Sequence, residues 1–369
     1  MKRILVLNYE FPPLGGGASP VSYDIAKRLS ETGDFDIDVV TMGYKDLPKY
    51  EEVNKNFRIH RVKSWRSKKE ICHPWEQATY LVSGWFKCKE LLNKNKYNIC
   101  HTHFIIPTGV LALKLKKKFG LPYIITSHGS DVLGYNARFK LLYPFLIKKW
   151  ESILDNAQKI ISPSNFLKTE ILKVYPEFDG QKIEVIPNGF DTNKFKPQEK
   201  KKYIFSSGRL LRNKGFQYLI QAAAEEDLGW EVHIAGDGPM RAELEEMAKK
   251  SKTKVVLHGW LDNNGREYKD LLEQASIFVL ASESESFGMV IAEAMSAGCA
   301  IISSDTSGCA EITGESGLLT KVGDIVDLQS KLVDLVSDSS LTRDFQTRSL
   351  EKSKEFDWSS VLREYIKML

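Results

Sequence analysis

The chain has 369 residues, of which 42% are hydrophobic and 27% are charged, so it is long enough for two domains with separate cores. Its five cysteines are scattered without a CxxC pair, which argues against a disulfide framework or a zinc site and favours reduced thiols in a cytoplasm. No run approaches the ~20 apolar residues of a membrane-spanning helix. The short apolar start meets Glu10 and Pro12 too soon for a signal peptide and is typical of a first strand.

Charge is distributed unevenly along the chain. Residues 1–190 contain 29 Lys and Arg against 19 Asp and Glu, a net charge of +10, whereas the remainder carries −6. This asymmetry indicates two domains with different partners, although solvated lysine faces would give the same pattern.

Strand-like and helix-like segments alternate through the first half. Short runs of β-forming residues predict strands at 3–9, 37–42, 57–63, 98–103, 123–128, 159–164 and 183–189. Apolar residues at helical spacing predict helices near 21–29, 76–92, 108–120, through Trp150, and at 165–175.

The alternation restarts in the second half. Strands are predicted at 202–208, 230–236, 255–259, 276–281 and 300–305. Helices are predicted after Lys214, at 240–250, at 268–275, after Gly288, and at 324–336, 341–354 and 359–368.

Repeated βα units predict parallel sheets with right-handed crossovers. Two such runs, joined at residues 187–200, predict an α/β protein with two Rossmann-like, doubly wound domains facing a cleft. We expect an N-terminal domain over 1–190, a C-terminal domain over 191–355, and a last helix at about 356–369 that packs back on the first domain. Ligands of such sheets bind outside the carboxyl ends of the strands, where all the motifs below fall.

Two glutamates lie eight positions apart across a glycine turn, from Glu285 to Glu293. Glu285 is predicted at the end of a strand and Glu293 on the helix that follows. The N–H groups at the start of that helix would bind phosphate; they belong to Phe287, Gly288, Met289 and Val290. Two acids flanking an anion site suit a nucleotide-sugar, although acids at a helix start often only balance the helix dipole.

A basic loop follows the first strand of the second half. It places Arg209 and Lys214 near a helix start, where Arg can bind phosphate oxygens in pairs and Lys supplies a mobile charge. Arg212 is expected to point outward. A merely solvated basic loop is the alternative.

Three glycines and three histidines fall at strand ends of the first half. Gly15, Gly16 and Gly17 would let backbone approach an anion, but the later glycine of the dinucleotide fingerprint is missing, which argues against nicotinamide or flavin. His128, in the segment 126–131, ends one predicted strand, and His101 and His103 end another. The latter pair lacks a third ligand at metal spacing.

Together these motifs resemble the retaining glycosyltransferases of family 4, which have the GT-B fold. The resemblance runs from about Gly15 to Glu311 and includes the Glu-x7-Glu pair, Gly-Arg-Leu…Lys-Gly at 208–215, Thr-x-His at 126–128, Ala-Gly-Asp-Gly-Pro at 235–239, Val-Leu-His-Gly-Trp at 256–260 and Pro-Asn-Gly-Phe-Asp at 187–191. Ser307 departs from it, because this loop usually reads Gly-Gly in the family.

The resemblance implies roles for these residues. Arg209 and Lys214 would hold the donor diphosphate in place of a metal, so that neither a metal nor a cofactor is expected. Glu293 would bind the ribose, Glu285 and His128 the transferred sugar, and Asp131 would orient the loop or the acceptor. Catalysis is thus assigned to His128, Glu285, Arg209 and Lys214, and donor binding also to Gly16, Gly17 and the 287–290 amides.

We therefore expect a cytoplasmic, metal-independent, retaining hexosyltransferase that uses a nucleotide-diphosphate sugar. Its acceptor would be a glycan or lipid-linked sugar of cell-envelope polysaccharide or glycolipid synthesis, and no nucleic acid partner is expected. The alternatives are a nucleotide-sugar epimerase of the same fold and an inactive subunit that binds sugar nucleotides.

Two segments that combine lysines with apolar residues, Phe139–Trp150 and Leu113–Lys118, suit peripheral contact with the inner face of a membrane. Amphipathic helices that pack on the protein's own sheet would show the same pattern of lysines and apolar residues.

Overall fold

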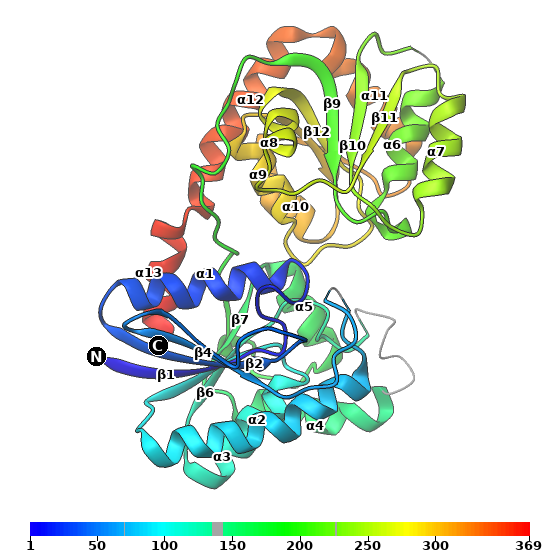
Figure 1. Cartoon of the computed structure of the whole chain (residues 1–369). Helices are drawn as coiled ribbons and strands as arrows, with labels where there is room; N and C mark the ends of the chain where they lie inside the picture. The colour runs from blue at the N-terminus through cyan, green and yellow to red at the C-terminus, as the bar shows by residue number, and fades with distance from the viewer. Residues whose placement is uncertain (70, 135–142, 226) are drawn as a thin grey trace. The chain divides into compact units, whose positions relative to one another are not determined.

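The computed structural model describes residues 1–69, 71–134, 143–225 and 227–369 (Figure 1). It divides into two compact units, one of Met1–Pro187 with Val361–Leu369 and the other of Asn188–Ser360.

The first unit contains an eight-stranded sheet in the order β3-β4-β2-β1-β5-β6-β7-β8. Its strands are β1 (Lys2–Leu7), β2 (Phe35–Met42), β3 (Tyr50–Asn54), β4 (Phe57–Val62), β5 (Ile99–His103), β6 (Tyr123–Thr126), β7 (Ile160–Ser162) and β8 (Ile183–Val185). Its helices are α1 (Ala18–Glu31), α2 (Pro74–Lys94), α3 (Thr108–Phe119), α4 (Tyr143–Asn156), α5 (Asn165–Val174) and the greater part of α13 (Trp358–Met368). In Figure 1, α1 lies on one face of this sheet and α2 and α3 lie on the other.

The second unit contains a six-stranded sheet in the order β11-β10-β9-β12-β13-β14. Its strands are β9 (Lys201–Ser207), β10 (Glu231–Ala235), β11 (Val255–Gly259), β12 (Ala275–Leu280), β13 (Ala300–Ser304) and β14 (Leu318–Thr320). Its helices are α6 (Phe216–Ala224), α7 (Arg241–Lys250), α8 (Arg266–Gln274), α9 (Met289–Ser296), α10 (Ser307–Thr313), α11 (Ile325–Ser337) and α12 (Ser339–Ser353).

Alternate residues of the central strands build two cores in the second unit. Phe205 and Phe278 point into a core with α8, α9 and α10, whereas Ile204 and Ile277 point into a core with α6, α7 and α11. Both faces of the sheet are therefore covered, as a parallel sheet requires.

Both sheets reverse their strand order next to the first strand of the unit. In the first unit the chain leaves β1 toward β2 and returns to β5 on its other side; in the second it leaves β9 toward β10 and returns to β12. Ligands of open α/β sheets bind at such reversals, outside the carboxyl ends of the strands.

The structure confirms the predicted α/β class and two doubly wound sheets, with one exception to parallel pairing. β3 pairs antiparallel with β4 at the sheet edge. The sequence does not predict it, because Tyr-Glu-Glu-Val-Asn is largely polar and none of its residues is fully buried. The short elements α10 and β14 were also missed.

The two segments predicted to contact a membrane differ in what they expose. In α3, Leu113 and Leu115 are buried, which leaves its lysines on the surface. Residues 139–142 of the other segment lie outside the described residues; in its remainder, at the start of α4, Phe145 is 82% exposed. Among the described residues, no helix combines the length and hydrophobicity needed to cross a bilayer.

Candidate active site

The loops after β9 and β12 are held together at the strand reversal of the second unit. Gly215 has a positive φ of 76°, and a Cβ there would lie 1.8 Å from the carbonyl oxygen of Ala281. The carbonyl of Asn213 accepts hydrogen bonds from the N–H of Glu283 at 2.8 Å and the hydroxyl of Ser282 at 2.9 Å. Only glycine at 215 permits this approach, so the basic loop lies beside the loop that carries Glu285.

Lys214 and Glu285 form a partly buried ion pair across these two loops. Arg209 lies on the same loop as Lys214, with its side chain exposed, and has no ion-pair partner among the described residues. Arg212 instead pairs with Glu243 on the surface, with contacts of 2.9 and 3.0 Å. The structure therefore joins two of the predicted catalytic residues directly and leaves Arg209 available for a ligand.

The start of α10, which follows β13, fixes the backbone of Glu285. The N–H of Glu285 donates to the hydroxyl of Ser307 at 3.1 Å, and its carbonyl accepts from the N–H of Gly308 at 2.9 Å. A Cβ at Gly308 would lie 2.7 Å from backbone atoms of Phe287, so this glycine is also required by packing. Glu285 is thus positioned by two neighbouring strand ends.

Glu293 lies on α9, which begins after Gly288 in a left-handed conformation (φ 97°). Its side chain is buried, with one oxygen 3.5 Å from Nζ of Lys194. The other oxygen, Oε2, has no hydrogen-bond partner among the described residues. Burial raises the pKa of Glu293, against the opposing effect of Lys194. Sequence reasoning missed Lys194, which lies in the second unit before β9 and belongs to no periodic pattern.

The glycine loop after β1 is ordered by contacts with the chain after β4. Gly15 has a φ of 95°, and a Cβ there would clash with Glu10. Its N–H donates to the carbonyl of Lys69 at 2.8 Å. A Cβ at Gly16 or Gly17 would meet nothing within 4 Å. Packing within the first unit therefore explains Gly15 but gives no reason for the other two.

Three buried histidines lie together at the ends of β5 and β6. Nδ1 of His103 and Nε2 of His128 are 3.1 Å apart, and the rings of His101 and His103 are 4.4 Å apart between centroids. Burial lowers the pKa of His128 to about 3, so this imidazole is neutral at pH 7. His128 lies two residues beyond the end of β6, rather than on the strand as predicted.

Asp131 holds the loop that carries His128. Its carboxylate accepts from the N–H of Ile105 at 2.7 Å and the N–H of His128 at 2.9 Å. Burial raises its pKa, and these hydrogen bonds oppose the shift. Within the described part of the chain, no three His, Cys, Asp or Glu side chains are arranged to hold a metal ion.

Two family models match the chain. "Glycosyltransferase Family 4" matches residues 15–194, and "Glycosyl transferases group 1" matches residues 189–352. The chain is also 30% identical over 319 residues to an uncharacterised glycosyltransferase of Methanocaldococcus jannaschii, covering 78% of this chain and 76% of that protein.

Solved structures share the fold. A sucrose-phosphate synthase from Thermosynechococcus elongatus has a TM-score of 0.84 at 20% identity, covering 100% of this chain and 98% of that one. Anabaena HepE in complex with UDP-glucose has a TM-score of 0.76 at 18% identity, covering 100% of both chains. With its two doubly wound sheets and its Glu-x7-Glu motif at a strand reversal, the chain belongs to the family 4 glycosyltransferases, retaining enzymes of the GT-B fold that transfer sugar from a nucleotide-sugar.

Proposed function

We propose that the second unit binds the donor through Glu293, Arg209, Lys214 and the start of α9, and that the acceptor is an anionic or lipid-linked glycan. The observation that carries this proposal is the buried, unpartnered Oε2 of Glu293. A buried acceptor without a hydrogen bond costs ~1–3 kcal/mol, and the hydroxyl of a bound ribose would supply the missing donor.

The diphosphate would lie between the basic loop and α9. The free N–H groups in the first turn of a helix favour phosphate, and Arg209 and Lys214 would add two positive charges. Lys214 would then exchange its ion pair with Glu285 for the diphosphate, which frees the Glu285 carboxylate to accept hydrogen bonds from the sugar.

This arrangement suits departure of a nucleoside diphosphate without a metal. The bond between the anomeric carbon and the diphosphate oxygen breaks, and an acceptor hydroxyl forms the new bond on the same face. The hydroxyl proton leaves with the diphosphate, whose developing charge is balanced by fixed cations and N–H groups.

In the first unit, Gly16, Gly17 and His128 would contact the donor. A Cβ at either glycine would meet no atom of the first unit within 4 Å, so packing does not explain these glycines. Close approach of a ligand to the backbone would explain them. The neutral imidazole of His128 can donate or accept a hydrogen bond at a sugar hydroxyl without introducing charge.

An anionic acceptor is supported by the net charge of +10 over residues 1–190. The structurally similar sucrose-phosphate synthase is named for a phosphorylated product, which also suits an anionic acceptor. We place the enzyme in the cytoplasm, at the inner face of the membrane, acting in cell-envelope polysaccharide or glycolipid synthesis.

A donor screen followed by a product assay tests the proposal. Nucleotide-sugars are screened by thermal shift, beginning with UDP-glucose because HepE was solved with it. A donor at 100 times its dissociation constant stabilises the fold by ~2.7 kcal/mol. With the donor identified, nucleoside diphosphate should be released only when an acceptor glycan is added. Release without acceptor, in which water takes the place of the acceptor hydroxyl, would contradict a transferase and support a hydrolysing epimerase.

A further inference from the structure

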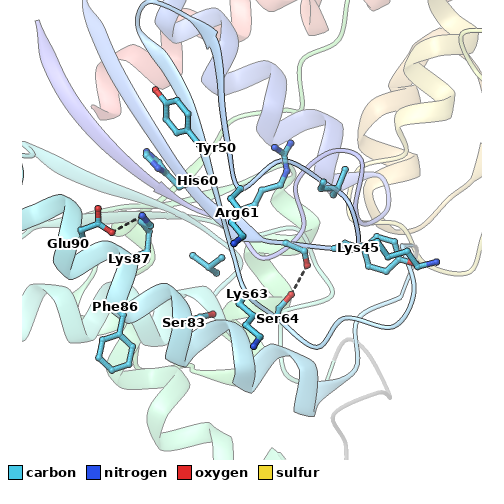
Figure 2. Close-up of a pocket in the computed structure, with 15 residues that line it drawn as sticks. Lys45, Tyr50, His60, Arg61, Lys63, Ser64, Ser83, Phe86, Lys87 and Glu90 are labelled. Atoms are coloured by element: carbon cyan, nitrogen blue, oxygen red, sulfur yellow. Dashed lines mark hydrogen bonds and ion pairs between the residues drawn. The ribbon is translucent and has the colours of Figure 1, made fainter.

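A pocket of about 1060 Å³ lies in the first unit, apart from all the site residues above (Figure 2). Gly43, which follows β2, and Lys63, which follows β4, contribute to its wall, and α2 closes it with Ser83, Phe86 and Lys87. The pocket therefore lies at the carboxyl ends of two strands, the end of the sheet at which ligands of this fold bind.

The lining is strongly cationic. Five of its side chains are positively charged and one, Glu90, is negatively charged; the cations are Lys45, Lys49, Arg61, Lys63 and Lys87. Glu90 pairs with Lys87 at 2.7 Å. Arg61 pairs at 2.7 Å with Glu51, which is outside the lining. In the described part of the chain, Lys45, Lys49 and Lys63 have no acidic partner.

The wall that carries these lysines is well fixed. The buried guanidinium of Arg61 donates to the carbonyls of Pro48 and Pro12, both at 3.3 Å. The hydroxyl of Ser64 donates to the carbonyl of Gly43 at 2.7 Å. Lys45 is held at a positive φ of 42°, a conformation that costs a non-glycine residue of order 1–3 kcal/mol. Lys45, Lys49 and Lys63 thus lie on segments after strand ends whose neighbouring residues are held by hydrogen bonds.

We propose that this pocket binds a phosphate group of the acceptor. The ammonium groups of Lys45, Lys49 and Lys63, which have no acidic partner among the described residues, match the charge and oxygens of a phosphate. The exposed rings of Tyr50 and Phe86 provide surfaces for an adjoining sugar or acyl chain. The strand order places β4 four positions from β6, about 19 Å at the usual strand spacing. The pocket would therefore hold a part of the acceptor remote from His128. This role rests on the proposed function; phosphate binding by the pocket does not.

Binding of inorganic pyrophosphate tests the site without any transfer reaction. Calorimetry is performed in an Arg209→Ala/Lys214→Ala background, which removes the cations proposed for the donor diphosphate. Lys49→Glu/Lys63→Glu is then added to the pocket. The matched control, Lys55→Glu/Lys96→Glu, changes two exposed lysines that precede β4 and β5. They lie at the amino ends of the strands, whereas the pocket lies at the carboxyl ends.

The pocket pair should weaken pyrophosphate binding at least about tenfold, and the control pair less than about twofold, because only the pocket lysines would contact the anion. Equal effects of the two pairs, or no pyrophosphate binding in the parent background, would overturn the proposal. Matched melting temperatures of the variants exclude a folding defect. Because pyrophosphate binding is measured without sugar transfer, failure of the pocket proposal can be told apart from failure of the proposed donor site.

Vesicles identify the source of the phosphate. Sedimentation of the full chain is compared between phosphatidylcholine vesicles and vesicles that also contain phosphatidylglycerol. If the pocket pair loses binding to the anionic vesicles and the control pair keeps it, the phosphate belongs to a lipid headgroup. If pyrophosphate binding depends on the pocket and vesicle binding does not, the phosphate belongs to a soluble glycan.

Discussion

The backbone N–H of Glu285 donates a hydrogen bond to the hydroxyl of Ser307, at 3.1 Å, and Ser307 accepts it from a left-handed conformation with a φ of 62°. The family usually has glycine in this loop, which suits that φ without strain. Serine here costs roughly 1–2 kcal/mol in backbone strain and gains a hydrogen bond of about 0.5–1.5 kcal/mol to the proposed sugar-binding residue. Serine at this position thus accepts backbone strain and in return holds the backbone of Glu285 with a hydrogen bond.

Ser307→Ala and Ser307→Gly should separate these two effects. Alanine keeps the strain and loses the hydrogen bond, so the free energy of unfolding should fall by about 0.5–1.5 kcal/mol. Glycine also relieves the strain and should leave that free energy at or above the parent value, while turnover falls in both variants. Denaturant unfolding and steady-state rates check this. A larger loss of stability with glycine than with alanine would be inconsistent with strain at this position.

Arg209→Ala and Lys214→Ala should each lower turnover by ~100- to 1000-fold, because each removes a positive charge from the leaving diphosphate. Arg212→Ala is the matched control, since this arginine lies on the same loop but pairs with Glu243 on the surface. Rates are measured under donor saturation, with circular dichroism to verify folding. Turnover within threefold of the parent for both variants would refute the diphosphate assignment.

Glu293 should make stability fall as pH rises. Its pKa in the folded chain is raised above the unfolded value of about 4.5, so the folded state binds the proton more tightly. Its contribution to stability is then greatest below pH 4.5 and declines as pH increases through the raised pKa. In Glu293→Gln the free energy of unfolding should lack this decline. Parallel pH profiles of parent and variant between pH 4 and about 7 would contradict the assigned shift.

Activity should persist in excess chelator, because Arg209 and Lys214 are proposed to balance the charge that a metal would otherwise neutralise. Sugar transfer is measured with and without EDTA, after prior dialysis against the chelator. Loss of transfer that magnesium or manganese restores would reveal a metal requirement.

Local patterns account for most of what the sequence predicted. The strand, glycine turn and helix around Glu285 and Glu293 are contiguous, so apolar periodicity was enough to place them. The same holds for Lys214 before α6. By contrast, β3 is a polar edge strand whose formation depends on pairing with β4, and its own composition gives little strand signal.

Contacts between residues far apart in the chain could not be predicted from local sequence patterns. Lys194 contacts Glu293 only because the chain before β9 lies beside α9 in the folded second unit. His103 and His128 share a hydrogen bond because β5 and β6 are neighbours in the sheet. The cationic pocket depends on three separate segments, each of which alone looks like an ordinary solvated lysine stretch.

Calorimetry with the bare nucleoside diphosphate of the identified donor tests the central claim most directly. Glu293 is proposed at the ribose and Glu285 at the transferred sugar, which the bare nucleotide lacks. Glu293→Gln should therefore weaken nucleotide binding by about tenfold or more, whereas Glu285→Gln should leave the dissociation constant nearly unchanged and slow transfer instead. Weaker nucleotide binding by Glu285→Gln than by Glu293→Gln would contradict the account.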